Sequence, residues 1–170
     1  MDKENSVMVV DQPNLLKVMS STRFAEGLTN SQLQCLCRAA RLVRVPRGTK
    51  LFCEGEMEDE IFIVSSGHVR LTMFVPGRGD VTFLTAGPGD LVGWSGLISD
   101  GRMTASGTVT EDSTLIALSG KRLQELCACE KELGYVLMKR VAQVLSQRLL
   151  ATRIQMLDLF AQQYQGEPVL

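Results

Sequence analysis

The sequence lacks any long apolar run. Its uninterrupted hydrophobic stretches are only a few residues long, whereas a helix needs roughly 20 apolar residues to span a bilayer. The first 12 residues begin with acidic and polar side chains, and they contain neither a basic start followed by an apolar core nor a small-residue cleavage site. We therefore expect a cytoplasmic protein without a membrane segment.

The chain also lacks an excess of charge of either sign. Its 18 Lys and Arg residues and 19 Asp and Glu residues give a formal net charge of −1 over 170 residues. A basic surplus is the usual mark of proteins that bind DNA or acidic membranes, so the overall balance indicates neither partner. The basic residues Lys139, Arg140, Arg148 and Arg153 are spread along a predicted helix. We expect no direct DNA binding.

Histidine is nearly absent, which removes most catalytic and metal-binding arrangements. His68 is the only histidine, and it follows a turn glycine at the start of a predicted strand. No nucleophile pattern or second histidine accompanies it, so neither a catalytic triad nor a metal cluster is indicated. We interpret the acidic run Glu54–Glu60 as a solvated turn rather than as paired catalytic carboxylates. The expectation is a protein that is not an enzyme and holds no metal.

The five cysteines do not suggest a disulfide framework. Their number is odd, and the chain shows no export signal, so reduced thiols are expected. Cys35 and Cys37, like Cys127 and Cys129, are separated by one residue, whereas zinc sites usually have two or more intervening residues. We interpret these cysteines as small buried hydrophobic residues, and a redox or iron–sulfur role is the alternative.

The hydrophobic period divides the chain into helical and β regions. From Pro13 to Ala40 apolar residues recur every three to four positions, which predicts two short helices with Thr29 as the N-cap of the second. From Arg41 the pattern changes to short β runs broken by Gly, Pro and Asp. The predicted strands are 42–45, 50–52, 61–64, 69–75, 81–84, 104–109 and 115–118. Turn residues at Pro76–Asp80 predict a hairpin, and the whole pattern predicts a barrel or sandwich.

Helical periodicity returns at Ser119, with a short helix through Cys127 and a long one from about Glu130 to Phe160. Such a helix is about 45 Å long, more than a domain of this size needs for its own core. Its apolar residues form two adjacent stripes: Leu133, Val136, Leu137, Val144, Ala151 and Ile154 in one, and Met138, Val141, Leu145, Leu149 and Met156 in the other. We expect a homodimer formed through residues 130–160, and a buried helix in a monomer is the alternative.

The spacing of glycines in the β region is the most specific motif. It reads Gly48-Thr-Lys-Leu-Phe-Cys-Glu-Gly55, then Ile61-Phe-Ile-Val, then Gly67-His-Val-Arg-Leu71. We expect positive φ at the first two glycines and a turn closed by the third. This run resembles the cyclic-nucleotide-binding domain family, which includes the catabolite activator and related bacterial regulators. The resemblance extends from about Arg23 to Phe160.

By this resemblance the fold class is α+β: a β-roll (double-stranded β-helix or jelly roll) with short N-terminal helices and a long C-terminal helix. The expected organisation is a flexible N-terminus at 1–12, a roll with flanking helices at 13–128, a dimerisation helix at 129–160 and a tail at 161–170. Transcription factors of the family follow the long helix with a helix-turn-helix domain. We expect a single-domain member without one, because this chain ends first.

The resemblance also implies a ligand site, the phosphate-binding cassette, here Gly87–Ile98 continued by Arg102–Ala105. Amides at the start of a short helix would form an anion site, and Arg102 would add a charge-assisted contact to a phosphate. The candidate ligand-binding residues are Gly93, Trp94, Ser95, Gly96, Leu97, Arg102, Met103 and Thr104. A surface arginine capping a strand is the alternative for Arg102. Backbone packing against the roll is the alternative for the two glycines.

Trp94 departs from the family's pattern. Many members carry Glu directly after the glycine at position 93, and that carboxylate accepts a hydrogen bond from the ribose hydroxyl. An indole can donate one hydrogen bond but cannot accept one as a carboxylate does, and it is much larger. Gly101 also stands where a proline often precedes the arginine. Trp94 could stack on a different ligand, turn outward, or fill the pocket.

These observations predict a stand-alone regulatory module that senses a nucleotide or a similar phosphate-bearing ligand. Cyclic AMP and cyclic GMP are the candidate ligands, no cofactor is expected, and the signal would pass through a dimer helix to an unidentified partner protein. The alternative is a ligand-free interaction or scaffold module whose pocket is filled by Trp94. Stabilisation by ligand separates the two hypotheses.

Overall fold

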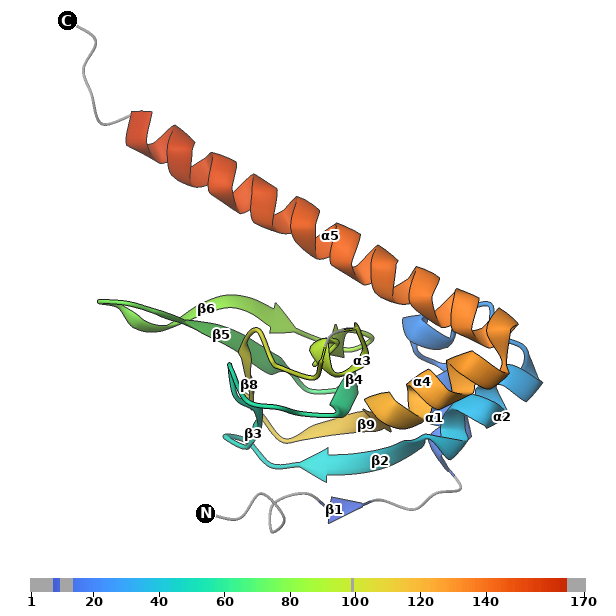
Figure 1. Ribbon diagram of the computed structural model, residues 1–170. Helices are drawn as coiled ribbons and strands as arrows, with labels where there is room; N and C mark the ends of the chain where they lie inside the picture. The colour runs from blue at the N-terminus through green and yellow to red at the C-terminus, as the bar shows by residue number, and fades with distance from the viewer. Residues whose placement is uncertain (1–7, 10–13, 99, 165–170) are drawn as a thin grey trace, which may run out of the picture. The chain divides into compact units, whose positions relative to one another are not determined.

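The computed structural model describes residues 8–9, 14–98 and 100–164. Within these residues nine strands form two antiparallel sheets (Figure 1). The first sheet has the order β1 (Met8–Val9), β2 (Ala40–Val45), β9 (Ser113–Ser119), β4 (Glu60–Ser66) and β7 (Leu91–Val92). The second has the order β3 (Lys50–Phe52), β8 (Ser106–Val109), β5 (Val69–Val75) and β6 (Gly79–Ala86). The two sheets form the β-roll that the sequence predicts.

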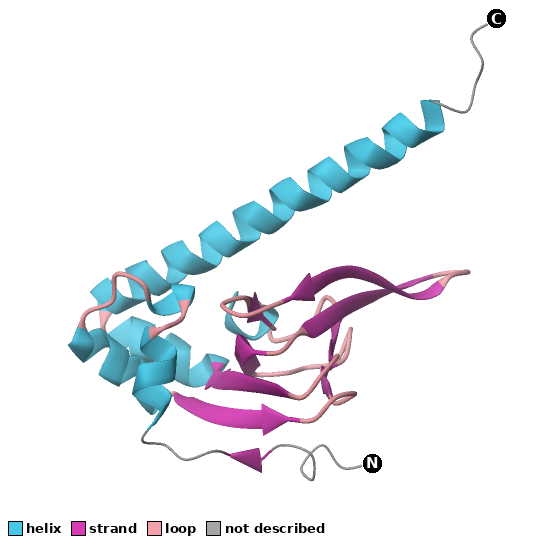
Figure 2. Cartoon of the chain, turned by 180° about the vertical axis from the view of Figure 1, so that it is seen from behind, coloured by secondary structure: helices cyan, strands magenta, loops and turns pink. Residues whose placement is uncertain are grey.

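Short helices gather at one end of this roll (Figure 2). The helices of the chain are α1 (Leu15–Ser20), the 3-10 turn η3 (Arg23–Ala25), α2 (Asn30–Arg38), α3 (Ser95–Ile98), α4 (Gly120–Cys129) and α5 (Lys131–Tyr164). Thr29 caps α2 as predicted: its hydroxyl accepts from the Gln32 amide, and the Gln32 side chain accepts from the Thr29 amide. This reciprocal capping box fixes where α2 begins.

The core fills the space inside the roll. It consists of Val43, Val45, Leu51, Phe52, Phe62, Val64, Val69, Leu71, Ala86, Val92, Met103, Val109, Leu115 and Ala117, with Leu84 packed against them. The rings of Phe52 and Phe62 stack with their centroids 6.4 Å apart. A Cβ at Gly107 would lie 2.5 Å from the Phe52 ring, so only glycine fits beneath that ring. The interior of the roll is thus closed by apolar side chains.

The predicted turn glycines adopt the expected backbone. Gly48, Gly55 and Gly67 have φ values of +85°, +80° and +84°. At Gly67 a Cβ would also come within 2.0 Å of the Ser113 hydroxyl oxygen, so both the backbone and the available space require glycine. The predicted positive φ is confirmed at Gly48 and Gly55, and Gly67 lies in the turn between β4 and β5, as predicted.

Two short strands were not predicted. Met8–Val9, inside the segment expected to be flexible, pair with Arg44 and Val43 of β2. Leu91–Val92 pair with Ile63 and Phe62 of β4. The sequence assigned these two residues to the cassette and predicted no strand there. Two residues are too few for an alternating pattern to be visible, so neither strand carries a sequence signal.

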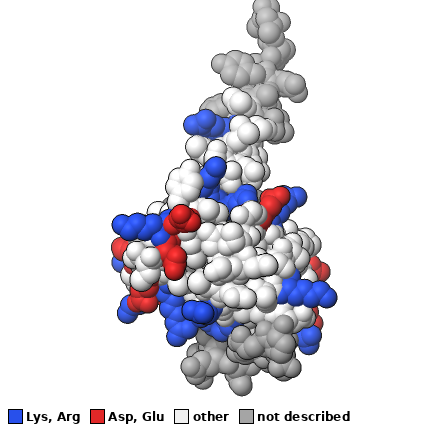
Figure 3. All heavy atoms as spheres, turned by 90° about the vertical axis from the view of Figure 1, so that its right-hand side faces the viewer, with Lys and Arg blue, Asp and Glu red and all other residues white. Residues whose placement is uncertain are grey.

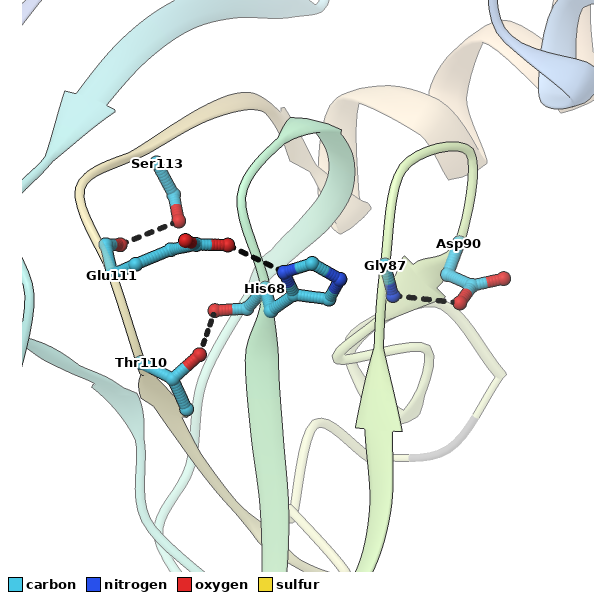
Figure 4. A network of polar contacts seen from close by, with 6 residues as sticks. All are labelled: His68, Gly87, Asp90, Thr110, Glu111 and Ser113. Atoms are coloured by element: carbon cyan, nitrogen blue, oxygen red, sulfur yellow. Dashed lines mark hydrogen bonds and ion pairs between the residues drawn. The ribbon is translucent and has the colours of Figure 1, made fainter.

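Three loops meet at one end of the roll around His68 (Figure 4). His68 Nδ1 lies 2.5 Å from a carboxylate oxygen of Glu111. The Thr110 hydroxyl donates to the His68 carbonyl at 3.2 Å, and the Ser113 hydroxyl donates to the Glu111 carbonyl at 2.7 Å. His68 therefore ties the turn before β5 to the turn before β9, as a turn residue.

The chain divides into two compact units, Met1–Val136 and Leu137–Leu170, and α5 crosses the division. With 34 residues, α5 is about 51 Å long. It continues past Phe160, where the sequence predicted its end, and residues 165–170 of the expected tail lie outside the described residues. In the second unit of this single chain the apolar residues Leu149, Leu150, Ile154, Met156 and Leu157 are exposed. Among the described helices, none is both long and apolar enough to cross a membrane.

Candidate functional site

Within the cassette, Gly93 cannot be replaced by another residue without strain. Gly93 follows β7 with φ +75°, and a Cβ there would lie 2.9 Å from the Glu60 carbonyl oxygen. A Cβ at Gly96 would lie 3.0 Å from the Glu58 carbonyl oxygen. Both glycines let the single turn of α3 pack directly on the backbone at the start of β4, which is the packing role that the sequence left open for them.

The amides of α3 are not the free donors that the sequence suggested. The Gly96 amide donates to the Gly93 carbonyl at 3.1 Å, and the Leu97 amide donates to the Trp94 carbonyl at 3.0 Å. Ser95, Gly96 and Leu97 are all buried. Both amides are used within this turn, so the expectation of an exposed amide cradle is wrong for Gly96 and Leu97.

The loop that carries Arg102 is clamped to the turn between β3 and β4. The Gly55 amide donates to the Met103 carbonyl at 2.8 Å, and the Met103 amide donates to the Glu56 carbonyl at 2.9 Å. The Glu58 amide donates to the Gly101 carbonyl at 2.9 Å. These bonds form a short bridge between Met57 and Arg102, so the arginine has a fixed backbone position.

The side chains after Gly101 alternate in direction. Arg102 and Thr104 are exposed, whereas Met103 is 2% exposed and belongs to the core of the roll. The Arg102 guanidinium donates one hydrogen bond, 2.7 Å long, to the Gly55 carbonyl oxygen. A guanidinium has five N–H donors, so the exposed Arg102 side chain has further donors that face solvent. Of the candidate residues, Arg102 and Thr104 are placed outside and Met103 inside.

Trp94 is half-buried, and it is not a member of the core cluster. The core residue nearest to Trp94 in the sequence is Val92, and the loop that carries Arg102 contributes Met103 to the core. The interior is therefore packed by residues from the strands and by Met103, rather than by the indole. This placement does not support a pocket plugged by Trp94.

The acidic run before β4 is structural at three positions. The Asp59 carboxylate accepts from the Lys121 amide at 2.8 Å and from the Ser119 hydroxyl at 2.7 Å, which caps the start of α4. A carboxylate oxygen of Glu54 accepts from the Phe74 amide at 2.8 Å. Glu60 forms an ion pair with Arg41. The interpretation as a merely solvated turn is wrong for these residues.

A second contact that the sequence did not reveal joins α3 to α4. The Gln124 side-chain amide donates to the Leu97 carbonyl at 2.9 Å. A Cβ at Gly120 would lie 2.2 Å from the Gly96 carbonyl oxygen, so the two helices touch through their backbones. The only local signal is a glycine directly after the last strand. The cassette and the helix that precedes α5 are thus in direct contact.

All five cysteines are free thiols. Burial raises the pKa of the Cys37 thiol and of the Cys127 thiol above the ordinary value of 9.0. Cys129 is exposed, and Cys35, Cys37 and Cys127 are half-buried. The interpretation of these cysteines as buried hydrophobic residues is therefore wrong for Cys129 and fits the other three only in part. Among the described residues, no group of three or more His, Cys, Asp or Glu side chains could hold a metal ion.

Charged side chains of both signs are scattered around a largely uncharged centre on the face drawn in Figure 3. Lys and Arg lie among Asp and Glu there, and no broad surface of a single sign extends over that face. Nucleic-acid-binding surfaces are usually a continuous basic stripe or patch. This face lacks one.

The fold and the cassette together define the class of protein. A model of the cyclic nucleotide-binding domain matches residues 42–129, which is more than half of the chain. The chain belongs to the cyclic nucleotide-binding domain family.

Similar proteins include regulators and isolated domains. The chain is 25% identical over 143 residues to a CRP-like cAMP-activated global transcriptional regulator of Mycobacterium tuberculosis, covering 84% of this chain and 62% of that protein. Its fold is similar to a cyclic nucleotide-binding domain from Methylobacillus flagellatus, with TM-score 0.79, 21% identity, and 93% and 92% of the two chains covered. The Thermus thermophilus catabolite activator protein gives TM-score 0.65 at 26% identity, over 81% of this chain and 62% of that one. The chain thus spans about 62% of the length of the mycobacterial regulator.

Proposed function

We propose that this protein is a regulatory module that binds a nucleotide or a similar phosphate-bearing small molecule at the cassette. Arg102 would contact the phosphate, and the bound state would be passed through α4 and α5 to a partner protein. Membership of the cyclic nucleotide-binding domain family and the activity named for the mycobacterial relative support this class of ligand.

The position of Arg102 is the observation that carries the proposal. Its backbone is held by the clamp between Gly101–Met103 and Gly55–Glu58. Its guanidinium donates one hydrogen bond to the Gly55 carbonyl, and the Arg102 side chain is exposed. A charged group with unused donors, held on a fixed backbone, is well suited to bind an oxyanion.

Transmission from the cassette rests on α3 and α4. A ligand that shifts α3 would act on the Gln124 bond to the Leu97 carbonyl and on the close approach of Gly96 and Gly120. The size of such a shift is limited by the difference in ligand affinity between the two states. The proposal therefore requires a ligand that binds the two arrangements of α3 unequally.

Thermal melting with and without nucleotide tests the proposal. Cyclic AMP or cyclic GMP at 100 times its dissociation constant should add about 2.7 kcal/mol of stability, which raises the melting temperature by about 5–10 °C. The ligand-induced rise should be lost in Arg102→Ala and kept in Arg78→Ala, an exposed arginine in the turn after β5.

The ligand-induced rise is compared within each variant, so any effect of Arg102→Ala on the unliganded protein cancels. If neither nucleotide raises the melting temperature, the ligand-free scaffold becomes the better description. An equal rise in wild type and Arg102→Ala would place the ligand away from the cassette arginine and reject its proposed role.

A further inference from the structure

A groove outside the cassette lies between the end of α2 and one face of α4. Its volume is about 330 Å³, and it is lined by Arg38, Ala39, Arg122, Glu125, Leu126 and Cys129. The four residues from α4 are spaced three, four and seven positions from the first, so they share one face of that helix. Pockets for small molecules have volumes of about 300–1,000 Å³, and this groove is at the lower end of that range.

The groove combines an apolar floor with three charges. Ala39 is buried, and Leu126 is half-buried beside it. Arg38, Arg122 and Glu125 are exposed, and within the described residues none of the three side chains forms an ion pair. Two guanidinium groups and one carboxylate therefore line a single small groove with their charges unpaired.

We propose that this groove binds a small amino dicarboxylate, a molecule with two carboxylates and one ammonium group. One carboxylate would pair with Arg38, the other with Arg122, and the ammonium with Glu125. A simple dicarboxylate would leave Glu125 facing negative charge, and a monocarboxylate would leave one guanidinium without a partner. Charge complementarity thus selects this class, with the aliphatic part of the molecule resting on Ala39 and Leu126.

The expected affinity is low, because all three charges are exposed and ion pairs in such positions contribute little. A dissociation constant on the order of 1 mM is expected for L-glutamate. The groove shares no residue with the cassette, so its binding can be tested separately from the nucleotide binding proposed above.

The Cys129 thiol provides a direct reporter, because it lines the groove and is exposed. We would alkylate the folded protein with neutral iodoacetamide and follow each cysteine by peptide mass spectrometry. With 10 mM L-glutamate, the alkylation rate of Cys129 should fall about tenfold if the dissociation constant is about 1 mM. Cys35 on α2 does not line the groove, and its rate should not change.

Comparison molecules and variants assign each charge. At equal ionic strength, L-glutamine and glutarate should bind up to about fivefold more weakly than L-glutamate, so 10 mM of either should slow alkylation only about threefold, because each lacks one of the three matching charges. Arg38→Gln and Arg122→Gln should each raise the dissociation constant for L-glutamate by up to about fivefold, the most expected for one exposed ion pair, whereas Arg78→Gln should not. Glu125→Gln should remove the preference for L-glutamate over glutarate.

The proposal is overturned if L-glutamate does not slow the alkylation of Cys129. It is also overturned if glutamine and glutarate protect as well as glutamate, or if both arginine variants keep full protection. Because Arg38, Arg122 and Glu125 are exposed, these variants are expected to fold, and unchanged melting temperatures would verify this.

Discussion

Two glycines allow close packing at the junction between the cassette and α4, because neither has a side chain. The backbones of Gly96 and Gly120 lie so close together that a Cβ on Gly120 would be 2.2 Å from the Gly96 carbonyl oxygen. Asp59 also caps the start of α4: its carboxylate accepts from the Lys121 amide, and its carbonyl accepts from the Gly120 amide. The contact depends on the absence of a methyl group at one position.

Substitution of Gly120 should therefore be costly. Gly120→Ala places its Cβ against a backbone oxygen that cannot rotate away, and we expect a loss of about 3 kcal/mol in the free energy of unfolding, measured with urea. Gly87→Ala is the matched control, because its Cβ would lie 3.4 Å from the His68 ring, an ordinary contact. The free energy of unfolding of Gly87→Ala should differ from that of the wild type by less than about 1 kcal/mol. Equal effects of the two variants would contradict the close approach.

Local rules explain which residues could be predicted from the sequence. Thr29 and the turn glycines at 48, 55 and 67 act on their immediate neighbours, so their types and spacing were enough. Asp59 and Gln124 act on groups 62 and 27 residues away. No local sequence pattern reveals a hydrogen-bond partner so far along the chain. The sequence alone therefore favours a solvated turn for the acidic run. The self-bonding of α3 was missed because hydrogen bonds inside a single turn depend on its geometry.

Among the elements, the β5–β6 hairpin shows how the roll ends. Val69 and Leu71 of β5 are buried in the core, but Met73 and Val75 on the same face are 43% and 36% exposed. Past Thr72, β5 no longer pairs with β8, and the Phe74 amide instead donates to Glu54. One carboxylate therefore replaces the missing strand at the edge of the hairpin.

Removal of that carboxylate should loosen the hairpin. In Glu54→Ala the hydrogen exchange of the Phe74 amide should become about tenfold faster, because a hydrogen bond to a charged acceptor is lost. Glu54→Gln keeps a neutral acceptor, so its exchange should rise by less than about threefold. Both rates are measured by amide exchange and NMR. Unchanged exchange in Glu54→Ala would show that Glu54 does not hold the hairpin.

The elements with a clear period were predicted well. The bounds of β3 and β5 match the prediction, because their alternation and flanking turns are distinct. The two-residue strands β1 and β7 carry no period. The helical pattern of α5 was judged to end at Phe160, but the polar residues that follow are equally compatible with a helix and continue it to Tyr164.

Across the whole molecule, α5 supports the expectation of a homodimer, which we retain as a proposal. In the single chain the apolar residues Leu149, Leu150, Ile154 and Leu157 are exposed, and burying such residues would be favourable. We predict a solution mass of twice the 18.7 kDa of one chain, measured by light scattering. Leu150→Glu combined with Ile154→Glu should shift the mass towards monomer, while Gln147→Glu should not. A wild-type protein that stays monomeric at about 100 μM would contradict the proposal.

The central claim is that a nucleotide binds at the cassette and is contacted by Arg102. The most direct measurement is a ¹H–¹⁵N NMR titration with cyclic AMP and with cyclic GMP. The indole signal is unambiguous because Trp94 is the only tryptophan. We predict saturable shifts of this indole and of the amides of 93–97 and 102–104 with at least one nucleotide. No shifts with either nucleotide, or shifts confined to residues outside the cassette, would contradict the account.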